Sequence, residues 1–190
     1  MENQYNTELL VPVSMQSIDP AAVSRSSTWA YWMSWEDLKR CPECEALHGK
    51  VYDQGKPYIP DTPEHYRCRC DIVPMLCIMA GFATTEGNNG ADWWLKNTGR
   101  LPEYYISNED IEALGWKKGK EPAKYAPSRM VTMGIYHNRN GHLPNSRGRI
   151  WYEADVSYYK GKRNSQRILW SNDGLIFVTY DHYKTFIEIQ

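Results

Sequence analysis

Four side chains suited to acid–base and phosphate chemistry lie in the last third of the chain. They are Glu153, His182, and the arginines Arg163 and Arg167, which are four residues apart. A carboxylate can take a proton from an attacking oxygen, an imidazolium can protonate a leaving oxygen, and guanidiniums stabilise charge on phosphate oxygens. Because RNA carries its own 2′-OH nucleophile, such a set would cleave it without a metal. The alternative is an ordinary charged sheet face, since such sets also arise by chance.

Cysteines form a second group, in the first half of the chain. A CxxC and a CxC motif, separated by 23 residues, comprise Cys41, Cys44, Cys68 and Cys70. Two close thiolate pairs can complete a tetrahedral Zn²⁺ site, with His65 or His48 as substitute ligands. Disulfides and reduced, buried thiols are the alternatives, and the lack of a secretory signal makes disulfides the weaker one. We expect Cys77 to be a small buried hydrophobe.

The second half predicts helices followed by strands. Ala91 to Thr98 is amphipathic and ends at Gly99, and Ser107 caps a second helix over residues 108–114. Stretches rich in aromatic and β-branched residues predict five strands, at residues 130–136, 149–158, 167–171, 175–180 and 184–189. Helices first and antiparallel strands afterwards define an α+β domain.

The first half is less regular. Residues 1–28 are a loosely ordered lead-in, and residues 29–83 form a small Cys-rich, loop-rich module. Trp29, Trp32 and Trp35 follow helical spacing, which predicts a packing stripe on a helix. The polar residues 84–90 predict a linker, so that the second domain covers residues 91–190.

Charge is distributed unevenly along the 190 residues. The net charge is −1, but residues 91–190 carry 15 basic and 11 acidic side chains, so that half is +4 and the rest is −5. A basic half indicates an anionic partner. The 42% apolar content excludes a wholly disordered tail or a fibre. The longest apolar stretch, residues 72–83, is too short to span a membrane, and no basic and apolar leader begins the chain, so we expect a cytoplasmic protein at synthesis with no membrane partner.

Short motifs run in order along the second half, among them GRLP at 99–102, EALGW at 112–116, EAD at 153–155, RNS at 163–165 and TYDHYKTF at 179–186. On these motifs residues 91–190 resemble the barnase-like microbial ribonucleases. The resemblance implies N-terminal helices packed on a five-stranded antiparallel sheet. It also implies an endoribonuclease that cleaves single-stranded RNA by 2′-OH transesterification, leaving a 2′,3′-cyclic phosphate and using no catalytic metal.

The same resemblance assigns roles to residues. Glu153 falls on the general base, His182 on the general acid, and Arg163 and Arg167 on the phosphate-binding arginines. The residues expected at the base-binding site are Tyr136, Asn138, Arg139, Asn140 and Tyr183. We expect Asp155 and Asp181 to support the backbone or the arginines rather than to act as second catalysts.

Two departures from the family pattern matter for function. Asn108 replaces an active-site lysine, and loss of one preorganised cation costs on the order of 10²-fold in rate. Asn140 replaces the acid that pairs with guanine, which an amide cannot do in the same way. The alternative function is therefore a catalytically impaired RNA-binding or phage-head structural protein.

The motifs RCPEC at 40–44, LHGKVY at 47–52 and PEHYRCRC at 63–70 occur in the first half. On them, residues 29–75 resemble the C-terminal end of phage Mu F-like minor head proteins. This resemblance implies a delivery or attachment module with the ribonuclease as toxic cargo, delivered or virion-associated. The ribonuclease resemblance implies RNA and an acidic barstar-like inhibitor as partners, and the phage-head resemblance implies phage-head or delivery proteins.

Overall fold

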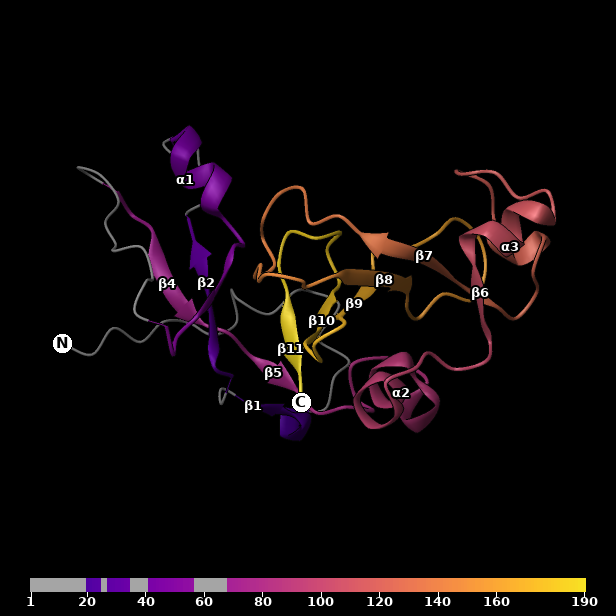
Figure 1. Cartoon of the computed structure of the whole chain (residues 1–190), viewed down its shortest axis with the longest axis horizontal. Coiled ribbons are helices and arrows are strands. Elements are labelled where there is room, and N and C mark those ends of the chain that lie inside the picture. The colour runs from indigo at the N-terminus through magenta and orange to yellow at the C-terminus, as the bar shows by residue number, and fades with distance from the viewer. Residues whose placement is uncertain (1–19, 25–26, 35–40, 57–67) are drawn as a thin grey trace.

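The computed structural model describes residues 20–24, 27–34, 41–56 and 68–190 (Figure 1). The helices are α1 (Pro42–Leu47), α2 (Ala91–Thr98) and α3 (Asn108–Ala113). The strands are β1 (Val23–Ser24), β2 (Trp29–Met33), β3 (Val51–Asp53), β4 (Asp71–Pro74), β5 (Cys77–Ile78), β6 (Tyr105–Ser107), β7 (Met130–Tyr136), β8 (Trp151–Asp155), β9 (Arg167–Ser171), β10 (Ile176–Thr179) and β11 (Ile187–Ile189). This mixed content confirms the α+β class.

One large sheet dominates the structure, in the order β1-β5-β11-β10-β9-β8-β7-β6. Strands β7 to β11 arise from the five predicted stretches, and these five strands pair antiparallel with one another. The sheet is larger than the predicted five strands, because β6 runs parallel beside β7 and β5 runs parallel beside β11. Backbone bonds from Gln190 N to Ile78 O (2.9 Å) and from Ala80 N to Gln190 O (2.7 Å) continue this pairing. The first half of the chain therefore covers an edge that β11 would otherwise expose.

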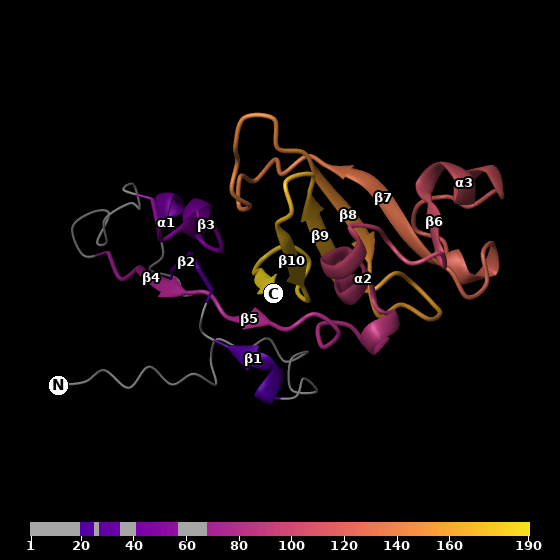
Figure 2. The same ribbon diagram turned by 60° about the horizontal axis from the view of Figure 1, so that its bottom comes forward.

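Helix α2 covers one face of the large sheet (Figure 2). Ala91 and Leu95 on this helix belong to one buried cluster with Ala154, Ile168 and Val178 of the sheet. Because side chains alternate across a strand, Glu153 and Asp155 project from the opposite face. We call that opposite face the site face.

Part of the first half of the chain packs on the site face. Trp29 and Met75 are buried there in one cluster with Trp151, Leu169 and Phe177. The rings of Trp29 and Phe177 meet edge to face with their centroids 6.0 Å apart. Since Phe177 pairs with Leu169 and Leu169 pairs with Glu153, this contact is two strands away from Glu153 on the same face.

Two of the three tryptophans that suggested a helix lie on a strand instead. Trp29 and Trp32 belong to β2, the centre of a three-stranded sheet in the order β3-β2-β4, whereas Trp35 lies outside the described residues. Residues three apart project from opposite faces of a strand. Trp29 can therefore pack on the large sheet, while Trp32, which is completely buried, projects from the other face of β2. The helical prediction was wrong because this packing overrides the local spacing.

Residues 84–90 lie against the second half of the chain. Asp92 is completely buried, and its carboxylate accepts hydrogen bonds from Gly81 N (2.8 Å), Ala83 N (2.9 Å) and the Thr84 hydroxyl (2.9 Å). The Tyr180 hydroxyl donates to Ala83 O (2.7 Å). The two halves also share the large sheet. The division of the chain into two domains stays a proposal. No helix in the described part of the chain is long and apolar enough to cross a membrane.

Candidate active site

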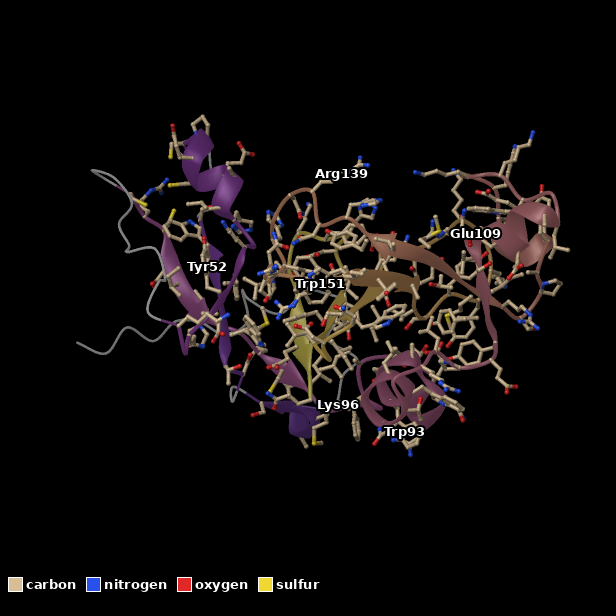
Figure 3. All side chains as sticks on the ribbon, in the orientation of Figure 1. Tyr52, Trp93, Lys96, Glu109, Arg139 and Trp151 are labelled. Atoms are coloured by element: carbon tan, nitrogen blue, oxygen red, sulfur yellow. The ribbon has the colours of Figure 1, made fainter. Side chains whose placement is uncertain are left out.

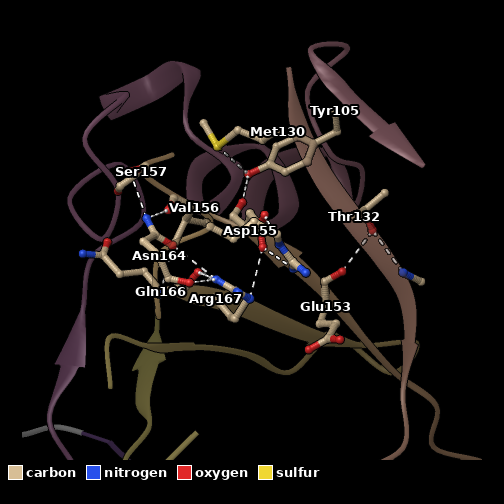
Figure 4. A network of polar contacts seen from close by, with 12 residues as sticks. Tyr105, Met130, Thr132, Glu153, Asp155, Val156, Ser157, Asn164, Gln166 and Arg167 are labelled. Atoms are coloured by element: carbon tan, nitrogen blue, oxygen red, sulfur yellow. Dashed lines mark hydrogen bonds and ion pairs between the residues drawn. The ribbon is translucent and has the colours of Figure 1, made fainter. Parts of the chain in front are cut away.

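Glu153 lies on β8, between β7 and β9 of the large sheet. Its backbone pairs with Gly134 on one side and Leu169 on the other, and its carbonyl accepts a bond from the Thr132 hydroxyl (3.0 Å; Figure 4). The Tyr183 hydroxyl donates to Glu153 Oε2 at 2.6 Å. Burial raises the pKa of Tyr183, and the adjacent Glu153 raises it further, so the phenol keeps its proton at neutral pH. One carboxylate oxygen is thus held by a phenol donor.

Asp155 joins the two arginines. It is completely buried, and it accepts two bonds from Arg163, from Nε at 2.7 Å and from Nη2 at 2.6 Å. Arg167 Nε lies 3.1 Å from Asp155 Oδ1, while Nη1 of Arg167 donates to the carbonyls of Asn164 (2.8 Å) and Gln166 (2.6 Å) (Figure 4). The expectation that Asp155 supports an arginine agrees with this geometry.

The two arginines differ in exposure. The Arg163 side chain is 17% exposed and that of Arg167 is 5% exposed, so Arg163 presents more of its guanidinium to the surface. Burial opposes the charge of Arg163, but its bonds to Asp155 and the negative charge of that group outweigh burial and raise its pKa. The Arg163 guanidinium therefore stays cationic, and Asp155 fixes it in place.

His182 lies in a strained loop after β10. His182 and Tyr183 both have positive φ, +62° and +69°, which non-glycine residues rarely adopt. Asp181 holds the loop, since its carboxylate accepts from the backbone N–H groups of Lys184 (3.1 Å) and Thr185 (3.0 Å). The Thr179 hydroxyl accepts from Tyr183 N at 3.0 Å. The His182 side chain is exposed, so it can reach a bound molecule.

The residues predicted to bind a base divide into two groups. The rings of Tyr136 and Tyr183 stack 5.3 Å apart at 15°, beside Glu153, and Arg139 projects outward on the 137–143 loop (Figure 3). Asn138 instead is buried, and its side chain bonds Leu143 O (2.7 Å) and Leu143 N (3.0 Å). Its side chain therefore closes the loop. The Asn140 side-chain oxygen accepts from His142 N at 3.2 Å, which keeps that amide within the loop.

Asn108 begins α3, next to β6. Its Nδ2 donates to Glu112 Oε1 at 2.8 Å, while its Oδ1 is buried without a hydrogen-bond partner. Ser107 precedes it on β6 and pairs with Thr132 on β7. Strand β7 in turn pairs with β8, which carries Glu153. The position carries no positive charge in this chain.

Three of the four cysteines predicted as zinc ligands gather beside the small sheet. The Sγ atoms of Cys44, Cys68 and Cys70 lie within 4.8 Å of one another, and those of Cys44 and Cys68 are 3.6 Å apart. Cys41 caps α1, and its Sγ accepts from Cys44 N at 3.4 Å. No disulfide joins the five cysteines, all of which are described. His48 Nδ1 accepts from Ser34 N (3.1 Å), and His65 lies outside the described residues.

One group beside the site was missed at the sequence level. His142 Nδ1 lies 3.4 Å from Tyr183 O, so this side chain links the 137–143 loop to the loop that carries His182. Burial lowers the pKa of His142, which favours its neutral form. No local pattern indicates this contact, because the two residues are 41 positions apart.

A sheet that presents a carboxylate, paired arginines and an exposed histidine on one side has the groups needed for cleaving a phosphodiester. Comparison with known proteins makes this class definite. A family model described as ribonuclease matches residues 90–190. The chain belongs to this ribonuclease family, and its second half is a barnase-like endoribonuclease domain.

Relatives named ribonuclease match 92 residues of the chain. The proteins of Heyndrickxia coagulans, Bacillus intermedius and Bacillus pumilus are each 44% identical to it over 92 residues, which is 48% of this chain. That stretch covers 84% of the first relative and 57% of the other two. The family model begins at residue 90, and the phage-head resemblance of residues 29–75 stays a prediction.

Proposed function

We propose that the chain cleaves single-stranded RNA by transesterification, with Glu153 as general base and His182 as general acid. Glu153 takes the proton of the ribose 2′-OH, and the 2′-oxygen bonds to phosphorus as the bond to the departing 5′-oxygen breaks. His182 gives its proton to that 5′-oxygen, and the product ends in a 2′,3′-cyclic phosphate. The observation that carries the proposal is the adjacency of Glu153, held by Tyr183, to the arginine pair held by Asp155.

The arginines supply the electrostatic part of the reaction. Arg163, the more exposed one, contacts a non-bridging phosphate oxygen, and Arg167 adds positive charge from a nearly buried position. Because Asp155 already holds both guanidiniums, little reorganisation is needed when charge develops on the phosphate. The stacked rings of Tyr136 and Tyr183 offer an aromatic surface for a base, and the exposed Arg139 and Asn140 lie on the adjoining loop.

The test is cleavage of a single-stranded RNA oligonucleotide in EDTA, with the product ends identified by mass spectrometry. Glu153→Gln and His182→Ala should each lower kcat by about 10² to 10⁴-fold. Glu103→Gln, which changes an exposed acid on the segment before β6, is the matched control and should keep the parent rate. Cleavage by Glu153→Gln and His182→Ala at the parent rate would refute the assignment of roles.

A catalytically impaired RNA-binding protein is the second candidate, and Asn108 is the observation that favours it. The family's lysine position here holds an amide that bonds Glu112. Salt-dependent RNA binding without turnover, at any enzyme concentration, would support this candidate. We favour the enzyme, because a base, an acid and two arginines all remain.

We also propose that the ribonuclease is a toxin carried by a phage-derived module. The proposal rests on the Mu F-like motifs of residues 29–75 and on the +4 charge of residues 91–190, which suits an acidic inhibitor. Induced expression should arrest growth of a bacterial host, and Glu153→Gln should relieve the arrest. A pull-down from the source cell should recover an acidic protein that restores growth; recovery of none would count against the inhibitor.

The cysteine cluster supports a structural zinc ion. Zinc–thiolate bonds of about 2.3 Å at tetrahedral angles place two sulfurs about 3.8 Å apart, close to the 3.6 Å between Cys44 and Cys68. Backbone N–H groups point at two of the sulfurs, from Cys44 to Cys41 and from Cys70 to Cys68, both at 3.4 Å. Such donors stabilise thiolate ligands.

Metal analysis of the purified chain tests this site. One zinc ion per chain is expected for the parent and a loss of zinc for Cys44→Ser. Cys77→Ser is the control, because Cys77 is also buried but lies on β5, where its thiol donates to Ser24 O at 3.4 Å. Equal zinc contents of the two variants would contradict the proposed ligand set.

A further inference from the structure

The loop of residues 49–51, which leads into β3, contacts both loops that border the active site. Val51 N donates to His142 O at 2.7 Å, and Val51 is buried in the cluster that contains Leu143 and Phe186. Gly49 lies so close to the 182–185 loop that a Cβ added to it would overlap the carbonyl oxygen of Lys184. The same Cβ would lie 3.6 Å from His142 Nδ1. Residues 49–51 therefore lie directly against the backbone next to His182.

This segment is itself held firmly. Gly49 N donates to Trp32 O and Trp32 N donates to Lys50 O, both at 2.9 Å, so the segment is tied to β2. Strand β2 in turn is anchored to the site face by Trp29, which packs against Phe177. A chain of packed and hydrogen-bonded groups thus runs from the centre of the large sheet to the loop that carries His182.

The contact leaves the site open. His182, Arg139 and Asn140 are exposed while residues 49–51 are in place. A segment that blocked the substrate would cover these side chains, so the geometry favours support of the loops over occlusion of the site. Support matters here, because His182 and Tyr183 have backbone conformations that surrounding structure must maintain.

We propose that Gly49 and Val51 are positioning residues for the ribonuclease reaction, which hold the His182 loop and the 137–143 loop from the first half of the chain. Gly49 allows the close approach to Lys184 O, Val51 fixes His142 O, and His142 joins this support to Tyr183 O. The inference rests on the proposed function, since it takes His182 as the general acid. Residues of the first half then help to position the catalytic loops of the ribonuclease half.

Gly49→Ala tests this role, with Gly174→Ala as the matched control. Both glycines have positive φ, +81° and +92°, so alanine is strained at either position. Gly174 has no atom within 4 Å of an added Cβ, whereas Gly49 meets Lys184 O. Both variants therefore strain the backbone, but only Gly49→Ala also displaces the 182–185 loop.

Two substrates separate positioning from general damage. A dinucleoside phosphate has a ribose 5′-oxygen as leaving group and needs the proton of His182, whereas a nucleoside 3′-(4-nitrophenyl phosphate) has a leaving group that departs without one. Gly49→Ala should lower kcat for the dinucleoside phosphate by about 10- to 100-fold and should alter the nitrophenyl substrate far less. Gly174→Ala should leave both rates near those of the parent.

Three results would overturn the inference: equal losses on both substrates, behaviour identical to that of Gly174→Ala, or a gain in rate, which would indicate restraint of the site. If Gly49→Ala does not fold, His142→Ala takes its place, because it removes the link to Tyr183 O and keeps the backbone of residue 142. This variant should show the same selective loss of kcat on the dinucleoside phosphate. His182→Ala is measured in parallel. If His182→Ala does not distinguish the two leaving groups, the proposed function fails, independently of the result for Gly49.

Discussion

Replacing Asp155 with asparagine removes a negative charge from a completely buried side chain that contacts two guanidiniums. Arg163 donates two bonds to this carboxylate, and Arg167 Nε lies 3.1 Å from it. The arginines are only 17% and 5% exposed, so water compensates little of the lost charge. Leaving one side of a buried ion pair uncompensated costs about 3–5 kcal/mol. A loss of that size lowers the ratio of folded to unfolded chains by a factor of about 150 to 5,000.

The pair of Arg149 with Asp173 is a control with the same geometry at the surface. Arg149 Nε and Nη2 lie 2.9 Å and 2.8 Å from the two carboxylate oxygens, but Asp173 is 44% exposed. Since solvent screens such a pair, Asp173→Asn should cost about 1 kcal/mol or less. The bond to Arg149 lowers the pKa of Asp173, so its contribution is present at neutral pH and is lost as the pH falls through that lowered pKa.

Urea unfolding at pH 7, followed by tryptophan fluorescence, measures both variants, and RNA cleavage measures their kcat. We expect Asp155→Asn to lose at least about 2 kcal/mol more than Asp173→Asn. It should also lose at least about tenfold in kcat, because displacement of a catalytic group by about 1 Å is costly. Equal losses of unfolding free energy in the two variants would refute the argument from burial. An unchanged kcat in folded Asp155→Asn would refute the positioning of the arginines by Asp155.

Three further predictions concern single side chains. Tyr183→Phe removes the donor to Glu153 but keeps a ring, and it should lower kcat by about 10-fold or more, since a hydrogen bond to a charged group is worth about 1.5–3 kcal/mol. Burial lowers the pKa of His142 from 6.5, so below pH 6.5 the unfolded chain binds more protons at this residue than the folded chain, and the unfolding free energy falls as the pH drops. His142→Gln should flatten this part of the curve of unfolding free energy against pH. Asn108→Lys should raise kcat by up to about 10²-fold by restoring a cation at the start of α3.

Each of these predictions has a result that contradicts it. An unchanged kcat in Tyr183→Phe would remove the phenol from the mechanism. A curve for His142→Gln that stays as steep as the parent's would assign the pH dependence to other groups. For Asn108, the uncharged Asn108→Met is the control; an equal gain in both variants would mean that charge is not the cause.

Part of the site was predictable from local pattern alone. Glu153 and Asp155 are two residues apart on a strand, so the sequence places them on one face of the sheet, and the structure finds them there. The helix Ala91–Thr98 was predicted with its correct ends, because Gly99 supplies the left-handed C-terminal conformation, φ +70°. Such features depend on residues a few positions apart.

Other features depend on which surfaces meet in three dimensions. The bond between Tyr183 and Glu153 joins residues 30 positions apart, and neither residue type requires it. The tryptophans of the first half mimic a helix in their spacing, yet Trp29 lies on a strand because the site face around Phe177 offers an apolar surface to bury it. The sequence likewise contains no sign that Gly49 would meet Lys184.

The sequence by itself determined the ribonuclease half, its α+β class and the chemical types of its reactive side chains, because motifs, periodicity and caps are local. Only the tertiary structure decided that the first half joins the large sheet at β11 and lies against the loop of His182. The physical reason is that an uncovered strand edge and an uncovered apolar face accept many partners. The choice among them is made by the complementary shape of the segment that covers them.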